Sequence, residues 1–201
     1  METSSWHNSR SSVGLSSKPR VIDGFLQTYP ALRAYADTAQ YADYRNPADG
    51  VVYPFICTDI PDETRTEVQQ RLDAELKRPV QAHTLFLRLS PAGVRVPHAV
   101  HTDNSMGRGS LMLYLTDKEG GTGFAEHRAL RLRSAPTDDG DLIRTTKDAH
   151  DMGNWRLWAR CGARENRACI FPAELFHVAL PVGGYGWGKQ DARLVLTAFF
   201  D

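Results

Sequence analysis

The chain has 201 residues, of which 41% are apolar and 24% are charged, and its 24 basic and 24 acidic side chains give a formal net charge of zero. This length fits one domain, and the composition is that of an ordinary globular protein. The balanced charge argues against a nucleic-acid partner and an anionic membrane surface, and no apolar run approaches the roughly 20 residues of a membrane-spanning helix. The three cysteines, Cys57, Cys161 and Cys169, include no closely spaced pair. This argues against a disulfide scaffold or a zinc ribbon and is typical of buried thiols in a reducing cytoplasm.

The N-terminal segment differs in composition from the rest of the chain. Residues 1–18 are rich in serine and poor in apolar side chains, which predicts a flexible tail. The segment lacks the apolar core of a secretory signal, so we expect a cytoplasmic protein. Residues 19–201 are then expected to form one ordered domain.

Two helices are expected early in this domain. Pro30 opens the first, which runs to Gln40 with apolar residues at helical spacing. The second is capped by Asp59, has Pro61 in its first turn and ends before Pro79, and its apolar residues recur every four positions.

Short strands dominate the rest of the chain. We expect strands at 20–26, 51–57, 83–89, 94–101, 111–115, 122–126, 169–171, 176–180 and 194–200. Leu130 and Leu132 alternate with Arg131 and Arg133, which predicts one more strand. Two helices followed by many short strands indicate a mainly β (α+β) fold, an antiparallel barrel or jelly roll with supporting N-terminal helices.

Residues 136–168 interrupt this rhythm with charged residues and an expected helix at 142–150. Trp155 and Trp158 lie three positions apart, so we expect them to pack on a short helix. Because inserted loops often carry specificity, we interpret this insertion as a lid over the mouth of the barrel.

Four residues suggest a metal and co-substrate site. His101 and Asp103 lie two positions apart, so in an extended chain they share a face and can reach a common point. With His177 they would form the 2-His-1-carboxylate set that holds Fe(II) and leaves positions open. Arg193 heads the last apolar strand and is a fixed cation that could bind a co-substrate carboxylate in a two-pronged bond.

The order of these motifs is similar to that of a known family. His101-Thr102-Asp103, Tyr114-Leu115-Thr116, Gly120-Gly121-Thr122, His177 and Arg193 together resemble the Fe(II)- and 2-oxoglutarate-dependent oxygenases, in particular their prolyl-hydroxylase-like branch. The resemblance extends from about residue 83 to residue 201. Thr116 replaces the usual asparagine, and a glycine-rich segment lengthens the usual connection of about ten residues between the distal histidine and the arginine.

The resemblance implies a double-stranded β-helix of the jelly-roll or cupin type, which would occupy residues 19–201. It makes His101, Asp103 and His177 the iron ligands, and it makes Arg193 the partner of the distal carboxylate of 2-oxoglutarate. Tyr114 and Thr197 would also contribute to the co-substrate site.

The implied reaction is the hydroxylation of a C–H bond in a small-molecule, amino-acid or peptide substrate. It would use Fe(II), 2-oxoglutarate and O2 and release succinate and CO2. Asp103 fills the ligand position that a halogenase leaves vacant, so the resemblance implies hydroxylation or desaturation. Two alternatives stay open: a peptidyl or protein hydroxylase, and a non-catalytic cupin-like protein that binds a metal or a small ligand.

Overall fold

The computed structural model describes residues 15, 17–46, 50–94, 99–118 and 120–201. Most of the predicted tail, and half of the strand predicted at 94–101, lie outside these residues. The helices among the described residues are all too short or too polar to cross a membrane.

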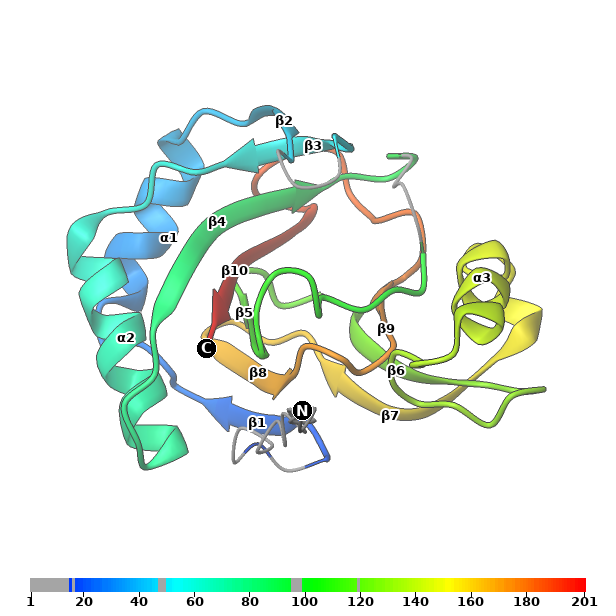
Figure 1. The fold of residues 1–201 in the computed structure, drawn as a ribbon. Coiled ribbons are helices and arrows are strands. Elements are labelled where there is room, and N and C mark those ends of the chain that lie inside the picture. The colour runs from blue at the N-terminus through cyan, green and yellow to red at the C-terminus, as the bar shows by residue number, and fades with distance from the viewer. Residues whose placement is uncertain (1–14, 16, 47–49, 95–98, 119) are drawn as a thin grey trace.

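Two antiparallel sheets form the walls of an open jelly roll (Figure 1). The seven-stranded sheet has the order β1 (Arg20–Asp23), β8 (Arg167–Pro172), β5 (Gly109–Tyr114), β10 (Arg193–Phe200), β4 (Ala82–Ser90), β3 (Val52–Cys57) and β2 (Ala42–Arg45). The three-stranded sheet has the order β7 (Trp155–Gly162), β6 (Gly121–His127) and β9 (His177–Leu180). This architecture confirms the mainly β, double-stranded β-helix fold predicted from the sequence.

Helices α1 (Tyr29–Thr38) and α2 (Asp62–Leu76) cover the outer face of the large sheet (Figure 1). Both helices were predicted, but the predicted cap of the second was wrong. Pro61, in an extended conformation, occupies the N-cap position of α2 without a side-chain hydrogen bond. Asp59 lies too far before Asp62, the first helical residue, to cap the helix, and its backbone carbonyl accepts a hydrogen bond from the Tyr35 hydroxyl.

Strand β10 separates two environments. All its residues are buried, because β4 and β5 pair with it on both sides. Alternate side chains project to opposite faces of a strand. One face joins the core beneath the helices: Leu194, Leu196, Ala198 and Phe200. The other face lines a cavity: Arg193, Val195, Thr197 and Phe199.

Segment 136–168 contains α3 (Asp139–Lys147), the short 3-10 helix η1 (Met152–Asn154) and strand β7. The helix expected for Trp155 and Trp158 is therefore wrong, since both residues belong to β7. Strand β7 pairs with β6 over its length, and the register shifts beside Trp158 in a β-bulge. The segment thus completes the small sheet as well as interrupting the strand order.

The strand predicted from the alternation of leucine and arginine at 130–133 is also wrong. The backbone turns there, with Arg131 in the left-handed region at a φ of 60°. The Arg131 amide donates a hydrogen bond to the carbonyl of His127, and the His127 amide donates to that of Leu132. These bonds close a tight loop after β6, so the alternation does not reflect a pleated strand.

Candidate functional site

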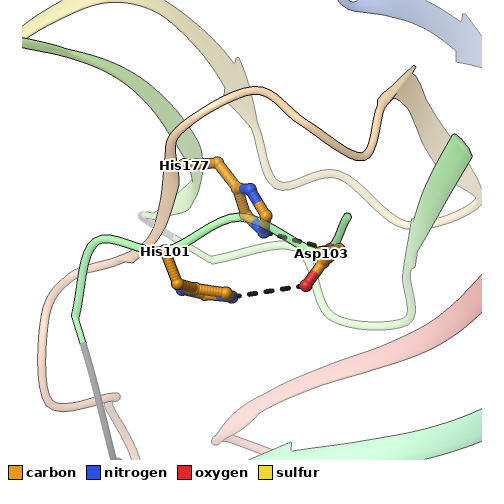
Figure 2. A group of neighbouring side chains, drawn as sticks. All are labelled: His101, Asp103 and His177. Carbon is orange, nitrogen blue, oxygen red and sulfur yellow. Dashed lines mark ion pairs between the residues drawn. The ribbon is translucent and has the colours of Figure 1, made fainter. Parts of the chain in front are cut away.

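The side chains of His101, Asp103 and His177 come together in one cluster (Figure 2). His101 and His177 form an isolated antiparallel bridge, in which each amide donates to the other residue's carbonyl at 3.0 and 2.9 Å. This pairing places the two imidazole rings 4.3 Å apart, centroid to centroid. The Asp103 amide donates to the carbonyl of Ala173 at 2.7 Å. One ligand atom from each of the three residues lies within 4.8 Å of the others.

Backbone carbonyls orient both imidazoles. Nδ1 of His101 lies 3.2 Å from the carbonyl oxygen of Ala99, and Nδ1 of His177 lies 3.0 Å from that of Leu175. A carbonyl oxygen only accepts hydrogen bonds, so each Nδ1 carries the proton and each Nε2 is left with a lone pair. This arrangement is typical of metal-binding histidines, whose second ring nitrogen donates to a backbone or carboxylate oxygen.

The two Nε2 atoms face the carboxylate of Asp103. Nε2 of His101 lies 3.7 Å from Oδ1 of Asp103, and Nε2 of His177 lies 3.3 Å from Oδ2 of Asp103. Among the described residues, the buried Nε2 of His177 has no hydrogen-bond partner. In their neutral form the two imidazoles direct Nε2 lone pairs toward the same point as the carboxylate, and such a point attracts a cation. The residues therefore fit a divalent metal, and two imidazole nitrogens with one carboxylate oxygen are the ligand set that suits Fe(II).

Ser110 holds the carboxylate in place. Its hydroxyl donates to Oδ2 of Asp103 at 2.9 Å, and both residues are buried. Burial on its own would raise the pKa of Asp103, but the positive charge of the protonated His177 and His101 imidazoles and the Ser110 hydroxyl lower it to about 2. Burial would lower the pKa of His177, and the facing Asp103 raises it. Asp103 is therefore ionised at neutral pH.

Arg193 lies in the wall of a cavity of about 220 Å³ that the cluster also lines. Only 4% of Arg193 is exposed, and within the described residues its Nε has no hydrogen-bond partner. Its guanidinium carbon lies 6.0 Å from the ring centroid of Tyr114. Burial lowers the pKa of Arg193, and Tyr114 and Tyr185 act in the opposite direction. A buried guanidinium without an acidic partner is costly, so the site is suited to an anion supplied by a ligand.

Tyr114 and Thr197 differ in their access to the cavity. The Tyr114 hydroxyl donates to Oγ1 of Thr122 at 2.7 Å, and the cavity lining does not include Tyr114. The ring of Tyr114 therefore lies against the guanidinium of Arg193 but does not itself line the cavity. Thr197 lines the cavity, and its hydroxyl contacts the sulfur of Met112 at 3.3 Å. A role for these two residues in co-substrate binding stays a prediction.

Two lining features were not predicted. The hairpin of β2 and β3 extends the large sheet and contributes Tyr44 and Tyr53 to the cavity wall. Arg88, on β4, also lines the cavity. The sequence pattern that could have indicated this is the alternation of Phe86, Arg88 and Ser90 with leucines of the core. By contrast, no described residue of segment 136–168 lines the cavity, and its role as a lid stays a prediction.

Known structures share this fold. The non-heme alpha ketoglutarate dependent carbocyclase SnoK from nogalamycin biosynthesis matches with a TM-score of 0.61 and 13% identity, over 97% of this chain and 85% of its own. The epimerase SnoN, in complex with Fe3+, alpha ketoglutarate and nogalamycin RO, gives 0.54 and 14%, over 90% of this chain and 78% of its own. A viral collagen prolyl hydroxylase from Paramecium Bursaria Chlorella virus-1 gives 0.53 and 15%, over 100% of this chain and 96% of its own.

At these identities the likeness establishes the fold, which is the jelly roll of 2-oxoglutarate-dependent oxygenases. No curated protein matches the sequence. One family model does match, over residues 7–200, and the chain therefore belongs to the family of unknown function DUF6445.

Proposed function

We propose that this protein is an Fe(II)- and 2-oxoglutarate-dependent dioxygenase that hydroxylates a C–H bond of a small-molecule, amino-acid or peptide substrate and releases succinate and CO2. One observation carries the proposal: the three ligand atoms of His101, Asp103 and His177 converge beside a cavity that also contains the buried cation of Arg193. A metal-binding cluster alone would suit many proteins. Its combination with Arg193, which has no ion-pair partner among the described residues, suits a metal and a dicarboxylic acid bound together.

His101, Asp103 and His177 would hold the iron, which when bound would activate O2 for oxidation of the C–H bond, coupled to the oxidative decarboxylation of 2-oxoglutarate to succinate and CO2. The protein's own contribution is positioning. The carbonyls of Ala99 and Leu175 keep the Nε2 lone pairs directed at the metal position, and Ser110 keeps Asp103 from rotating away.

Arg193 would bind the distal carboxylate of 2-oxoglutarate. Its planar fork of donors matches a carboxylate, and its burial strengthens the attraction because little water competes. The SnoN structure, which holds Fe3+ and alpha ketoglutarate in the same fold, supports the pairing of these two ligands.

Anaerobic addition of Fe(II) and 2-oxoglutarate to the full chain tests the proposal. We expect a visible charge-transfer band, and after admission of O2 we expect succinate. His177→Ala should lose both signals because it removes one ligand, whereas His150→Ala, which alters an exposed histidine, should keep both. A protein that only binds a metal or a small ligand would give no band with 2-oxoglutarate and no succinate. The absence of the band, the absence of succinate, or full activity of His177→Ala would contradict the proposal.

A further inference from the structure

The cavity contains a second arginine that the iron and co-substrate site does not use. Arg88 lies on the cavity face of β4 and pairs with Val195 of β10, while Arg193 pairs with Ser90. The two arginines are therefore diagonal neighbours on one face of the sheet, with Cα atoms about 7–8 Å apart. Two positive charges in one partly desolvated wall repel each other, so their placement requires a reason.

The two side chains extend in opposite directions across the sheet. Arg193 lies over the ring of Tyr114 on β5, whereas the guanidinium carbon of Arg88 lies 5.8 Å from the ring centroid of Tyr53 on β3. Since β10 and β4 lie between β5 and β3, the two cations point away from each other. This arrangement suits the binding of two separate anions, one by each arginine, and not the binding of one anion by both.

Arg88 has no acidic partner among the described residues. Burial lowers its pKa to about 10, the charge of Arg193 acts in the same direction, and Tyr53 and Asp103 oppose both. The guanidinium is therefore still protonated at neutral pH. Its position against an aromatic ring keeps it oriented toward the cavity without neutralising it.

The charged residues that line the cavity indicate the charge of a second ligand that would neutralise it. Among the described lining residues, Arg88 and Arg193 contribute two positive charges and Asp103 one negative charge. A divalent metal brings the total to three positive charges, and the two negative charges of 2-oxoglutarate leave one positive charge uncompensated. A monoanionic second ligand would neutralise the cavity, and a carboxylate fits this charge better than a phosphate dianion.

The cavity that Arg88 lines has a mainly apolar wall. Phe86 on β4 and Phe199 on β10 contribute two rings to it, with centroids 6.0 Å apart. Other apolar lining residues are Ile56, Val94, Met106, Met112, Val178, Val182 and Val195. We infer that Arg88 binds a carboxylate of the substrate that is oxidised, and that this substrate is a small organic acid with a largely apolar body. This inference rests on the proposed function, because the charge count includes the metal and 2-oxoglutarate.

The test uses the full chain with Mn(II) in place of iron and saturating 2-oxoglutarate, so that nothing is turned over. The probes are the straight-chain acids from butanoate to decanoate, each compared with its own primary amide by isothermal titration calorimetry. We expect at least one acid to bind at least about tenfold more tightly than its amide, which is the usual strength of a charge-assisted hydrogen bond in a partly buried site.

Substitution of Arg88 should remove this preference selectively. Arg88→Gln should weaken binding of the acid at least about tenfold and leave the amide and 2-oxoglutarate within about threefold, while Arg88→Lys keeps part of the preference. Arg193→Gln should instead weaken 2-oxoglutarate at least about tenfold. Arg131→Gln, which alters an arginine with 76% of its side chain exposed, should change nothing. If Arg88→Gln does not fold, as judged by its thermal transition, Arg88→Met is measured in its place.

Three outcomes separate this inference from the proposed function. If no acid in the series binds better than its amide, or if Arg88→Gln keeps the full preference, the role of Arg88 is refuted and the oxygenase proposal stands. If Arg88→Gln weakens 2-oxoglutarate as much as Arg193→Gln does, Arg88 belongs to the co-substrate site and the inference is refuted. If the wild-type protein with Mn(II) does not bind 2-oxoglutarate, the proposed function fails first and this inference fails with it.

Discussion

Ser110 shows how one buried hydroxyl determines the orientation of a metal ligand. The residue lies on β5, paired with Phe199 of β10 and Phe171 of β8, so its position is fixed by the centre of the large sheet. Its hydroxyl donates a hydrogen bond to Oδ2 of Asp103 in the cluster. The carboxylate thereby keeps its remaining lone pairs toward His101 and His177.

We predict that Ser110→Ala lowers the affinity for a divalent metal by about 10–100-fold, because the carboxylate loses the partner that orients it. The affinity can be measured by calorimetric titration with Mn(II). The matched control is Ser105→Ala, which removes a hydroxyl from an exposed residue that also lines the cavity. Equal affinities in the two variants would mean that Asp103 is oriented by its backbone alone.

The residues of the cluster and their supports differ in how far the sequence predicts them. His101, Asp103 and His177 have side chains with few common roles inside a protein, so their order along the chain was informative. Ser110 and Arg88 have side chains that are frequent on solvated strand faces. Only the closing of the two sheets around a cavity distinguishes them from surface residues, and one sequence does not contain that information.

In β6, the close approach to β7 depends on Gly121. Gly121 has a φ of 128°, and a Cβ atom there would lie 2.0 Å from the carbonyl oxygen of Cys161. Its partner across the β6–β7 pair is Gly162, where the nearest atom to a Cβ would be 4.0 Å away. The two glycines face each other, but only Gly121 lacks the space for a Cβ atom.

We predict that Gly121→Ala destabilises the fold by about 2–4 kcal/mol, since the new Cβ both strains the backbone and forces β7 away. For a chain of this size the thermal midpoint should fall by roughly 5–15 °C. Gly162→Ala is the control and should stay within about 2 °C, because its Cβ enters open space. A similar loss in both variants would show that the sheet rejects any side chain at this pair.

Periodicity predicted the central strands well and failed at the periphery. Strands β4, β5 and β10 alternate between a core face and a cavity face, and β8 alternates between two buried hydrophobic clusters, so their pattern has a physical cause. The alternation at 130–133 has no such cause, and the backbone hydrogen bonds of a tight loop determine the structure there. At Trp158 a β-bulge breaks the two-residue period, which made a strand look like a helix. Strand β2 is exposed throughout and has no burial pattern to detect.

At the scale of the whole molecule, metal binding should be coupled to stability. The ligand atoms of His101, Asp103 and His177 come from separate segments that only the folded chain brings together, so a metal should bind the folded state much more tightly than the unfolded chain. A metal that binds only the folded state stabilises it by about 2.7 kcal/mol at a concentration of one hundred times the Kd.

We therefore predict that saturating Mn(II) raises the thermal midpoint by roughly 5–10 °C and that a chelator reverses the shift. Scanning calorimetry with and without the metal measures this directly. Asp103→Asn should show no shift with Mn(II), whereas Asp117→Asn, which alters an exposed carboxylate, should respond like the wild type. A shift that persists in Asp103→Asn would place the stabilising metal elsewhere.

The position of β10 has a consequence for biosynthesis. It follows the other strands of its sheet in sequence, yet it lies between β4 and β5. While the ribosome is still synthesising residues 193–200, those two strands have no partner on the edges that β10 will occupy, and unpaired apolar edges invite association between nascent chains. The cavity wall, with Arg193 in it, is thus completed only when β10 inserts between β4 and β5.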